Sequence, residues 1–281
     1  MSENSKFRTA CVQLCSGLDI DANIKMASAL IEEAARGGAD FIVTPENTSL
    51  LALDRETLLA HTVVQDEDRA LRAFQILADR LERWLLIGSL PIRVTPEMTA
   101  NRSFLISPSG RIAAYYDKIH MFDVELPGGE NYRESDYVQA GKRAVTAPLP
   151  WGRIGLSICY DLRFAALYRA LAKDGAEFFS APAAFTKTTG RAHWHVLLRA
   201  RAIENGAFMF AAAQTGRHEN GRDTYGHSLI ISPWGEILVE AGEEPCVIFA
   251  DIDPADAAAA RGRIGALRHD RDFRIEHVNP A

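Results

Sequence analysis

The chain has 281 residues, of which 47% are hydrophobic and 24% charged, and its formal net charge is -6. An acidic balance without a basic run argues against nucleic acids and anionic membrane surfaces as partners. No apolar stretch approaches the roughly 18 residues of a membrane span, no signal peptide is recognisable, and the four cysteines are too scattered for a disulfide scaffold. We therefore expect a globular, cytoplasmic protein with free thiols.

The first half of the chain alternates short apolar runs with helical patterns. Apolar residues recur with helical spacing over 21–36, and the Gly-Gly pair that follows predicts the end of that helix. A second helix is expected over 66–83, and a hairpin over 103–116 turns at a Pro-Ser-Gly sequence. The strands expected in this half are 7–14, 41–43 and 84–90.

The second half repeats this order of elements. Helices are expected over 164–173 and 194–204, and a second hairpin is expected over 228–239. The strands expected in this half are 153–159, 177–181, 207–213 and 246–252. Residues 254–281 are expected to form a C-terminal tail that packs on a neighbour or is partly mobile.

The two predicted hairpins are similar in sequence. Ten residues from Ser103 and ten from Ser228 align at an offset of 125, and six of the ten positions are identical. Both segments could simply be common hairpin turns. The alternative is two similar α-β halves, which predicts an α/β fold with two sheets face to face in a four-layer α-β-β-α sandwich. No Pro/Gly/Ser-rich linker separates the halves, so we expect one domain over 1–281 with its core at about 7–253.

Cys159 is the first candidate for chemistry. It ends an apolar strand and is followed by a predicted helix. A thiol at a strand-to-helix turn lies near helix N-terminal amides, which stabilise a thiolate and an oxyanion alike. Taken alone, a cysteine in a strand is more often structural, because Cys is among the most buried residue types.

Two charged residues have surroundings that favour chemistry. Glu46 directly follows a buried strand, where it either caps a helix or acts as an acid or base with a pKa raised by desolvation. Lys118 lies among aromatic and apolar residues. A buried ammonium there would stabilise an oxyanion, whereas the ordinary alternative is a side chain that reaches out to solvent.

Each of these three residues lies in a longer motif. The motifs are Thr44-Pro45-Glu46, Asp117–Val124 and Gly155–Phe164. In this order they resemble the nitrilase superfamily of carbon-nitrogen hydrolases, and the resemblance extends from about residue 7 to 253. Further segments are similar to the Nit branch of that superfamily: 127–135, 188–194, 197–205 and 232–235. The resemblance implies the four-layer sandwich, an amidase that needs no cofactor, and a homodimer or larger homo-oligomer.

The resemblance also implies a catalytic set. Cys159 would attack the amide carbon, and Glu46 would take the thiol proton and pass it to the leaving amine. Lys118 and the backbone amide of Tyr160 would hold the oxyanion, and water activated by Glu46 would then hydrolyse the acyl-thioester. Glu134 matches a second glutamate of the family and would orient Lys118; the alternative is an acid of a surface loop.

Residues for the substrate are expected near this set. Arg163 would point back toward the pocket mouth from the first helical turn and bind a substrate carboxylate, unless it pairs with Asp161 or another structural acid. By resemblance, Thr189 contacts the α-keto acid end of the substrate. The branch usually has Pro and Glu where this chain has Arg191 and His195. Arg191 is expected to add a cation for a second substrate carboxylate.

The branch suggests a small carboxylated amide as the substrate. Segment 211–228 is similar to that of amidases acting on deaminated glutathione, and an ω-amidase acting on α-ketoglutaramate is the alternative. Hydrolysis of an N-carbamoyl amino acid or a nitrile uses the same catalytic set. A non-catalytic binding or scaffold protein is the alternative from another class.

Three histidines were considered as metal ligands: His193, His195 and His227. Residues two apart on a helix do not share a face, so His193 and His195 are not expected to bind one ion. We therefore expect no metal site.

Overall fold

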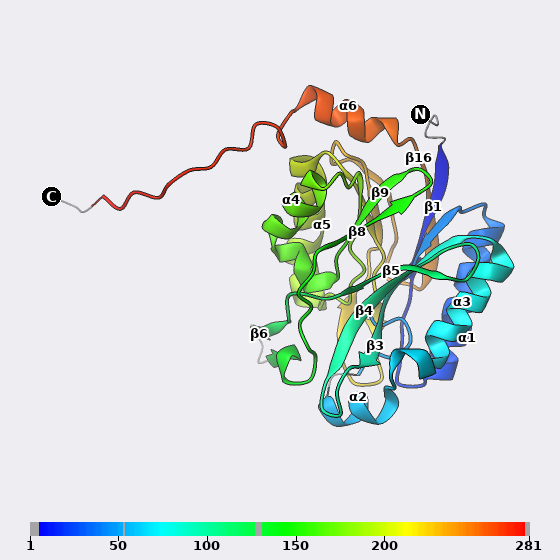
Figure 1. The fold of residues 1–281 in the computed structure, drawn as a ribbon. Helices are drawn as coiled ribbons and strands as arrows, with labels where there is room; N and C mark the ends of the chain where they lie inside the picture. The colour runs from blue at the N-terminus through cyan, green and yellow to red at the C-terminus, as the bar shows by residue number, and fades with distance from the viewer. Residues whose placement is uncertain (1–5, 53, 127–130, 279–281) are drawn as a thin grey trace.

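Two six-stranded sheets form the centre of the protein in a computed structural model that describes residues 6–52, 54–126 and 131–278 (Figure 1). From one edge to the other, the first sheet contains β16 (Cys246–Ile252), β1 (Phe7–Gln13), β2 (Phe41–Val43), β3 (Trp84–Arg93), β4 (Thr99–Ile106) and β5 (Ile112–Asp117). The second contains β15 (Ile237–Glu240), β14 (Leu229–Ile231), β11 (Phe208–Ala211), β10 (Phe178–Ser180), β9 (Gly152–Leu156) and β8 (Val145–Leu149).

The two sheets have the same internal plan. Strands β1, β2 and β3 are parallel, β4 and β5 continue the sheet antiparallel, and β16 pairs antiparallel with β1. In the second sheet β9, β10 and β11 are parallel, β14 and β15 continue it antiparallel, and β8 pairs antiparallel with β9. The two similar hairpins of the sequence therefore occupy equivalent places in two similar halves.

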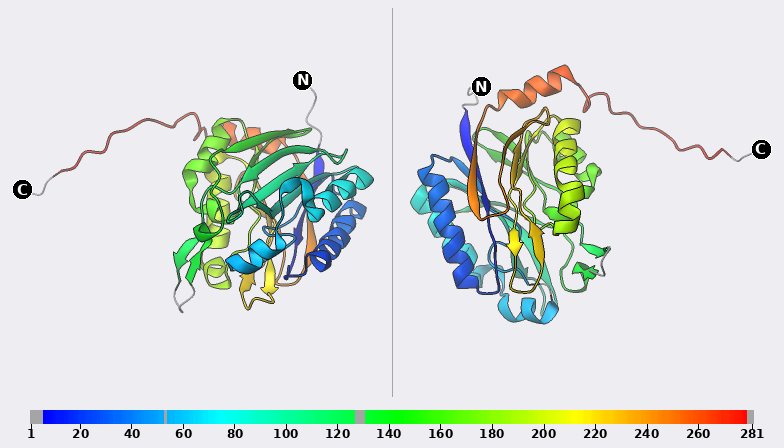
Figure 2. Two further views of the ribbon diagram at one scale, coloured as in Figure 1. Left: turned by 60° about the horizontal axis from the view of Figure 1, so that its bottom comes forward. Right: turned by 180° about the vertical axis from the view of Figure 1, so that it is seen from behind.

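Helices cover the outer face of each sheet (Figure 2). The first sheet is covered by α1 (Ile20–Arg36) and α3 (Arg69–Leu81), and the second by α4 (Ala165–Lys173) and α5 (Lys187–Asn205). The remaining α-helices of the described residues are α2 (Arg55–His61) and α6 (Ala255–Arg263). Two small ribbons pair β6 (Asp123–Glu125) with β7 (Asn131–Arg133) and β12 (Thr215–Arg217) with β13 (Asp223–Tyr225). This arrangement confirms the predicted four-layer sandwich.

Local signals set the helix ends. The side chains of Asp19, Asp68 and Thr186 cap α1, α3 and α5 by accepting backbone N–H groups of the first turn. Gly206 ends α5 in the left-handed conformation, with φ of 54°. Among the described residues, none of the helices combines the length and apolar composition that a membrane crossing requires.

Side chains of β1 point alternately to the two faces of the first sheet, so this strand packs against both neighbouring layers. Phe7 and Cys11 belong to the core between the two sheets, whereas Ala10 and Val12 pack with the residues of α1 and α3. Across the sheet interface, the rings of Phe41 and Phe210 meet edge to face with centroids 5.8 Å apart. Packing between the sheets therefore sets how the ends of β2 and β11 lie relative to each other.

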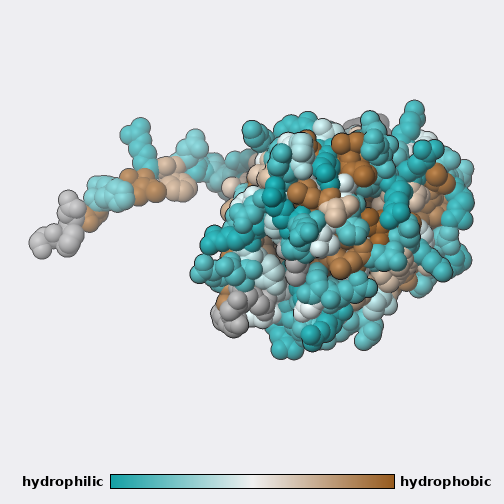
Figure 3. Space-filling model, turned by 90° about the horizontal axis from the view of Figure 1, so that it is seen from below, coloured by the Kyte–Doolittle hydropathy of each residue, from teal (hydrophilic) through white to brown (hydrophobic). Residues whose placement is uncertain are grey.

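Some sequence-based boundaries are wrong. Helix α5 begins at Lys187 rather than 194, because Thr186 supplies the cap and an internal glycine interrupts the apolar pattern. Residues 254–281 are not wholly a tail, because an alanine-rich run of high helix propensity forms α6. After α6 the described residues extend away from the body as an arm (Figures 1 and 3). Residues 127–130 of the segment 127–135 lie outside the described residues.

We expect Phe210→Ala to lower the free energy of unfolding by about 3–5 kcal/mol, because it opens a cavity between the sheets. Phe273→Ala is the matched control, since that ring is 85% exposed, and it should change the value by no more than about 0.5 kcal/mol. Urea denaturation measures both. Similar values for the two variants would contradict an inter-sheet core at Phe210.

Candidate active site

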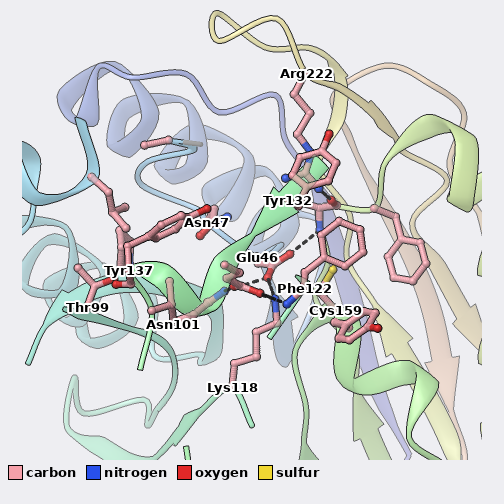
Figure 4. A pocket seen from close by; sticks show the side chains of 18 of the residues that line it. Glu46, Asn47, Thr99, Asn101, Lys118, Phe122, Tyr132, Tyr137, Cys159 and Arg222 are labelled. Atoms are coloured by element: carbon pink, nitrogen blue, oxygen red, sulfur yellow. Dashed lines mark hydrogen bonds and ion pairs between the residues drawn. The ribbon is translucent and has the colours of Figure 1, made fainter. Parts of the chain in front are cut away.

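A pocket lies where strand ends of both sheets meet (Figure 4). Glu46 follows β2, Lys118 follows β5 and Cys159 follows β9, and all three line this pocket. The side chains point toward one another in Figure 4. The first sheet thus supplies a carboxylate and an ammonium, and the second supplies a thiol.

Lys118 is the central cation of the pocket. Its side chain is only 2% exposed, so its charge requires buried partners. Its Nζ donates to Glu46 Oε1 at 2.9 Å and to both carboxylate oxygens of Glu134 at 2.9 Å. Burial alone would lower the pKa of Lys118, but the two carboxylates raise it well above its usual range. Lys118 is therefore a permanent cation.

Glu46 is fixed through both carboxylate oxygens. Oε1 accepts from Lys118 and, at 2.9 Å, from Asn101 Nδ2, while Oε2 accepts from the backbone N–H of Ala184 at 2.8 Å. Burial acts to raise the pKa of Glu46, but the charge of Lys118 and the hydrogen bond to it lower the pKa below its usual range. The upward shift expected from desolvation is therefore wrong, because the ion pair outweighs it, and Glu46 is ionised at neutral pH.

Glu134 is not an acid of a surface loop. Its side chain is 13% exposed, and besides Lys118 it accepts the backbone N–H of Phe122 at 2.6 Å through Oε2. The structure thus places Glu134 where the sequence predicted, against the ammonium of Lys118.

Cys159 begins a short 3-10 turn, Cys159–Arg163, directly after the β9 region. Its φ is 49°, in the left-handed region that residues other than glycine rarely adopt, and its N–H donates to Pro182 O at 2.9 Å. Burial, the charge of Glu46 and a hydrogen bond to Glu46 raise the pKa of the thiol well above its usual range, and Lys118 offsets only part of this. The resting pair is therefore a neutral thiol beside a carboxylate.

Asp161 holds the turn that carries Cys159. It is fully buried, and its Oδ2 accepts the N–H of Ile158 at 2.9 Å and the hydroxyl of Tyr116 at 2.7 Å. Its Oδ1 accepts the N–H of His120 at 3.1 Å. From the sequence, Asp161 is expected only as an ion-pair partner of Arg163. Asp161 lies two residues after the cysteine, beside a turn whose backbone N–H groups need acceptors. This position in the sequence could have indicated its role.

Gly88 supports the turn that carries Glu46. A Cβ at this position would lie 2.1 Å from the carbonyl oxygen of Thr44, 2.4 Å from that of Pro45 and 2.5 Å from the Cβ of Pro182. The Gly88 N–H also donates to Thr44 Oγ1 at 3.0 Å. Only glycine allows this close approach, so β3 fixes the backbone leading to Glu46.

Arg222 lines the pocket and was not among the predicted residues. It lies in the loop between β12 and β13, and its guanidinium lies over the ring of Tyr132, with 5.1 Å from Cζ to the ring centroid. One Nη donates to the carbonyl oxygen of Ala184. Its Nε is buried and has no hydrogen-bond partner among the described residues. The same loop is tied down at Asn220, whose Nδ2 donates to Leu51 O at 2.7 Å.

Of the four predicted substrate residues, the structure brings two to the pocket. Tyr160 and Thr189 line it, whereas Arg163 and Arg191 do not. Arg163 lies 3.2 Å from His193 Nδ1 through Nη1, and Arg191 is exposed on α5.

The two arginines lie outside the pocket lining for separate geometric reasons. Successive residues of a 3-10 turn are rotated by about 120°, so a residue four positions on points away, unlike in an α-helix. This turns the Arg163 side chain by about 120° relative to Cys159. Its guanidinium lies over the rings of Tyr160 and Phe185, with 5.7 and 5.5 Å from Cζ to the ring centroids. The early start of α5 puts Thr189 and Trp194 on its buried face and leaves Arg191 outside that face.

The known proteins that match this chain agree on one family. The family model described as carbon-nitrogen hydrolase matches residues 8–262. A deaminated glutathione amidase of Synechocystis sp. is 40% identical over 267 residues, which cover 94% of this chain and 97% of the relative. That of Yersinia enterocolitica is 39% identical over 266 residues, covering 93% and 92%. The crystal structure of the C. elegans NitFhit protein matches with a TM-score of 0.88 and 34% identity, covering 95% of this chain and 65% of that chain.

We expect Gly88→Ala to lower the free energy of unfolding by at least about 1–3 kcal/mol, because the new methyl group overlaps backbone oxygens. Gly242→Ala is the control, since nothing lies within 4 Å of its Cβ position, and it should change the value by no more than about 1 kcal/mol. Both are measured by urea denaturation. Equal effects of the two substitutions would show that the approach of β3 to the Glu46 turn is not tight.

Proposed function

Because the chain belongs to the carbon-nitrogen hydrolase family, we propose that it is a thiol amidase that hydrolyses deaminated glutathione through a cysteine acyl-enzyme. The main support is that Cys159 lines the same buried pocket as Glu46 and Lys118, whose Oε1 and Nζ are 2.9 Å apart. These are a nucleophile, a base and an oxyanion stabiliser in one pocket. The amidases named in the comparison support the choice of substrate.

In the first half of the proposed reaction, Cys159 Sγ attacks the amide carbon and Glu46 takes the thiol proton. The positive charge of Lys118 and the backbone N–H of Tyr160 stabilise the negative oxygen of the tetrahedral intermediate. Glu46 then gives the proton to the nitrogen of the breaking C–N bond. The amine leaves, and the acyl group stays on sulfur as a thioester.

In the second half, Glu46 takes a proton from water, and the oxygen of that water attacks the thioester carbon. The C–S bond breaks, the thiol regains a proton, and a carboxylic acid is released. Glu134 keeps Lys118 in place through both steps, since it holds the ammonium with both carboxylate oxygens. Each proton transfer is therefore assigned to Glu46, whose two oxygens are held by fixed donors.

We assign the recognition of a substrate carboxylate to Arg222. Among the described residues that line the pocket, Lys118 is paired with carboxylates, whereas Arg222 is not. The Nε of Arg222 has no hydrogen-bond partner there and can donate to a ligand. A guanidinium suits a carboxylate because it offers parallel N–H donors. Thr189 also lines the pocket and is proposed to bind the neighbouring keto oxygen. This proposal gives Arg222 the carboxylate-binding role that the sequence led us to expect of Arg163.

The proposal extends to the setting of the enzyme. The four cysteines are unpaired, which supports a reducing, cytoplasmic location. Assembly with a second copy is supported by the C-terminal arm, where the apolar side chains of Phe273, Ile275 and Val278 are 85%, 77% and 84% exposed. Packing against a second copy would bury them.

Turnover of deaminated glutathione tests the function. We expect Cys159→Ala to reduce kcat/KM by about 10⁴-fold or more, because no thioester can form. Cys246→Ala is the matched control, a partly exposed cysteine in β16 outside the pocket, and it should retain activity. Release of the amine product is measured with deaminated glutathione and with α-ketoglutaramate in parallel.

A higher kcat/KM for deaminated glutathione supports the proposal. A preference for α-ketoglutaramate would move the assignment to an ω-amidase, and unchanged turnover by Cys159→Ala would contradict the thiol mechanism.

We expect Arg222→Ala to raise KM for deaminated glutathione by about 10- to 100-fold, because a hydrogen bond to a charged group contributes about 1.5–3 kcal/mol. Arg163→Ala, which removes a guanidinium that packs behind the lining residues Tyr160 and Phe185, should change KM much less. Steady-state kinetics of both variants give the comparison. A larger KM effect of Arg163→Ala would return the carboxylate to the residue first predicted.

A further inference from the structure

Three potential metal ligands converge outside the catalytic pocket, between α5 and the hairpin of β14 and β15. They are His195 on α5, His227 just before β14 and Glu240 at the end of β15, and none of them lines the pocket. Their ligand atoms all lie within 4.8 Å of one another. Residues far apart in the sequence thus meet at one point between a helix and a hairpin.

Glu240 is the centre of this cluster. Its Oε1 lies 3.0 Å from His195 Nε2 and 2.7 Å from His227 Nδ1. The side chains of the two histidines are 29% and 22% exposed, and that of Glu240 is 36% exposed. The three atoms therefore face one partly buried point that solvent ions can still reach.

The surrounding structure holds the two rings in place. The ring of Tyr225 stacks on that of His227 with centroids 4.4 Å apart, and it meets His195 edge to face at 6.0 Å. The backbone of His227 has a φ of 54°, and its carbonyl oxygen accepts from Trp194 Nε1 at 2.7 Å. The cluster is therefore ordered by packing rather than by chance encounter of flexible side chains.

The expectation of no metal site rested on the spacing of His193 and His195 along one helix. His193 does not join the cluster but lies against Arg163, as the helical geometry requires. The partner of His195 is His227, which is 32 residues away in sequence and reaches the same site through the turn before β14. Spacing along the helix carries no information about that pairing.

We propose that His195, His227 and Glu240 bind one divalent first-row transition-metal ion, with water completing the coordination. Two imidazoles and one carboxylate form a donor set that suits Zn²⁺ and its neighbours, with metal–ligand distances of about 2.0–2.2 Å. The observed N–O separations of 3.0 and 2.7 Å need only small adjustments to admit such an ion.

Each of the three side chains offers one atom to a metal ion. Each histidine would bind through the nitrogen that now faces Glu240, so its single proton would lie on the opposite ring nitrogen. Glu240 would bind as a carboxylate, and its pKa is held below its usual range by hydrogen bonds to His195 and His227, against the effect of burial. Nearby, Glu243 is paired with Lys187 at 2.9 Å, and Arg191 adds a positive charge that opposes a cation.

The bound ion would tie α5 to the hairpin of β14 and β15. Because a metal that binds only the folded state stabilises it by mass action, occupancy can be followed without any assay of activity. The metal site can therefore be tested independently of the proposed function. Absence of metal binding would not contradict the amidase activity, and absence of that activity would not contradict metal binding.

Isothermal titration with Zn²⁺ and thermal unfolding test the site, in a Cys159→Ala background that removes the catalytic thiol as a competing ligand. We expect one Zn²⁺ per chain and a Tm that rises by roughly 5 °C at saturating metal. His195→Ala, His227→Ala and Glu240→Gln should each abolish both effects. His193→Ala, on the same helix two residues away, should leave both unchanged.

Two outcomes would overturn the proposal. One is the absence of stoichiometric Zn²⁺ binding in the Cys159→Ala protein. The other is binding that survives all three ligand substitutions, which would place the ion on another group, such as the partly exposed thiols of Cys15 and Cys246.

Discussion

The catalytic pocket depends on the neutralisation of one buried ammonium. An ion buried without a partner costs on the order of several kcal/mol, so Lys118 at the end of β5 requires the carboxylates of Glu46 and Glu134 at hydrogen-bonding distance. This requirement brings together segments that are 72 and 16 residues apart from the lysine. It also keeps Glu46 ionised and therefore leaves the proton on Cys159, so the charges are arranged before any substrate binds.

The pocket also needs both halves of the sandwich. The first half contributes three charged groups, and the second contributes Cys159 and the Ala184 N–H that fixes Glu46. The equivalent turns after β2 and β10 read Thr-Pro-Glu and Ala-Pro-Ala in the sequence, so one side of a similar pair carries a carboxylate and the other does not. Close contact of Gly88 with Pro45 and Pro182 holds the two turns together. Similar halves thus form a site with distinct functions on each side.

Local sequence patterns predicted most strands, the longest helices and, through the repeated hairpin, the layered fold. Glu46, Lys118 and Cys159 were found because charged or reactive residues stood next to apolar strands. Arg222 was not found, since its position depends on a short ribbon and on a contact with the distant Ala184 carbonyl. The 3-10 turn that carries Arg163 was not foreseen, because periodicity does not distinguish such a turn from the start of an α-helix. Sequence patterns therefore did not reveal which side chains long-range contacts bring to the pocket.

The pairing of β16 with β1 has a consequence for biosynthesis. All seven residues of β1 pair with β16, which lies more than 230 positions later in the chain. During translation the N-terminal strand emerges early and keeps an unpaired edge until residue 252 has left the ribosome. Such an edge is a template for pairing with other chains, and contacts of this sequence separation form slowly. The nascent chain therefore has its greatest need of chaperone protection at the start of its sequence, where its first sheet waits longest for completion.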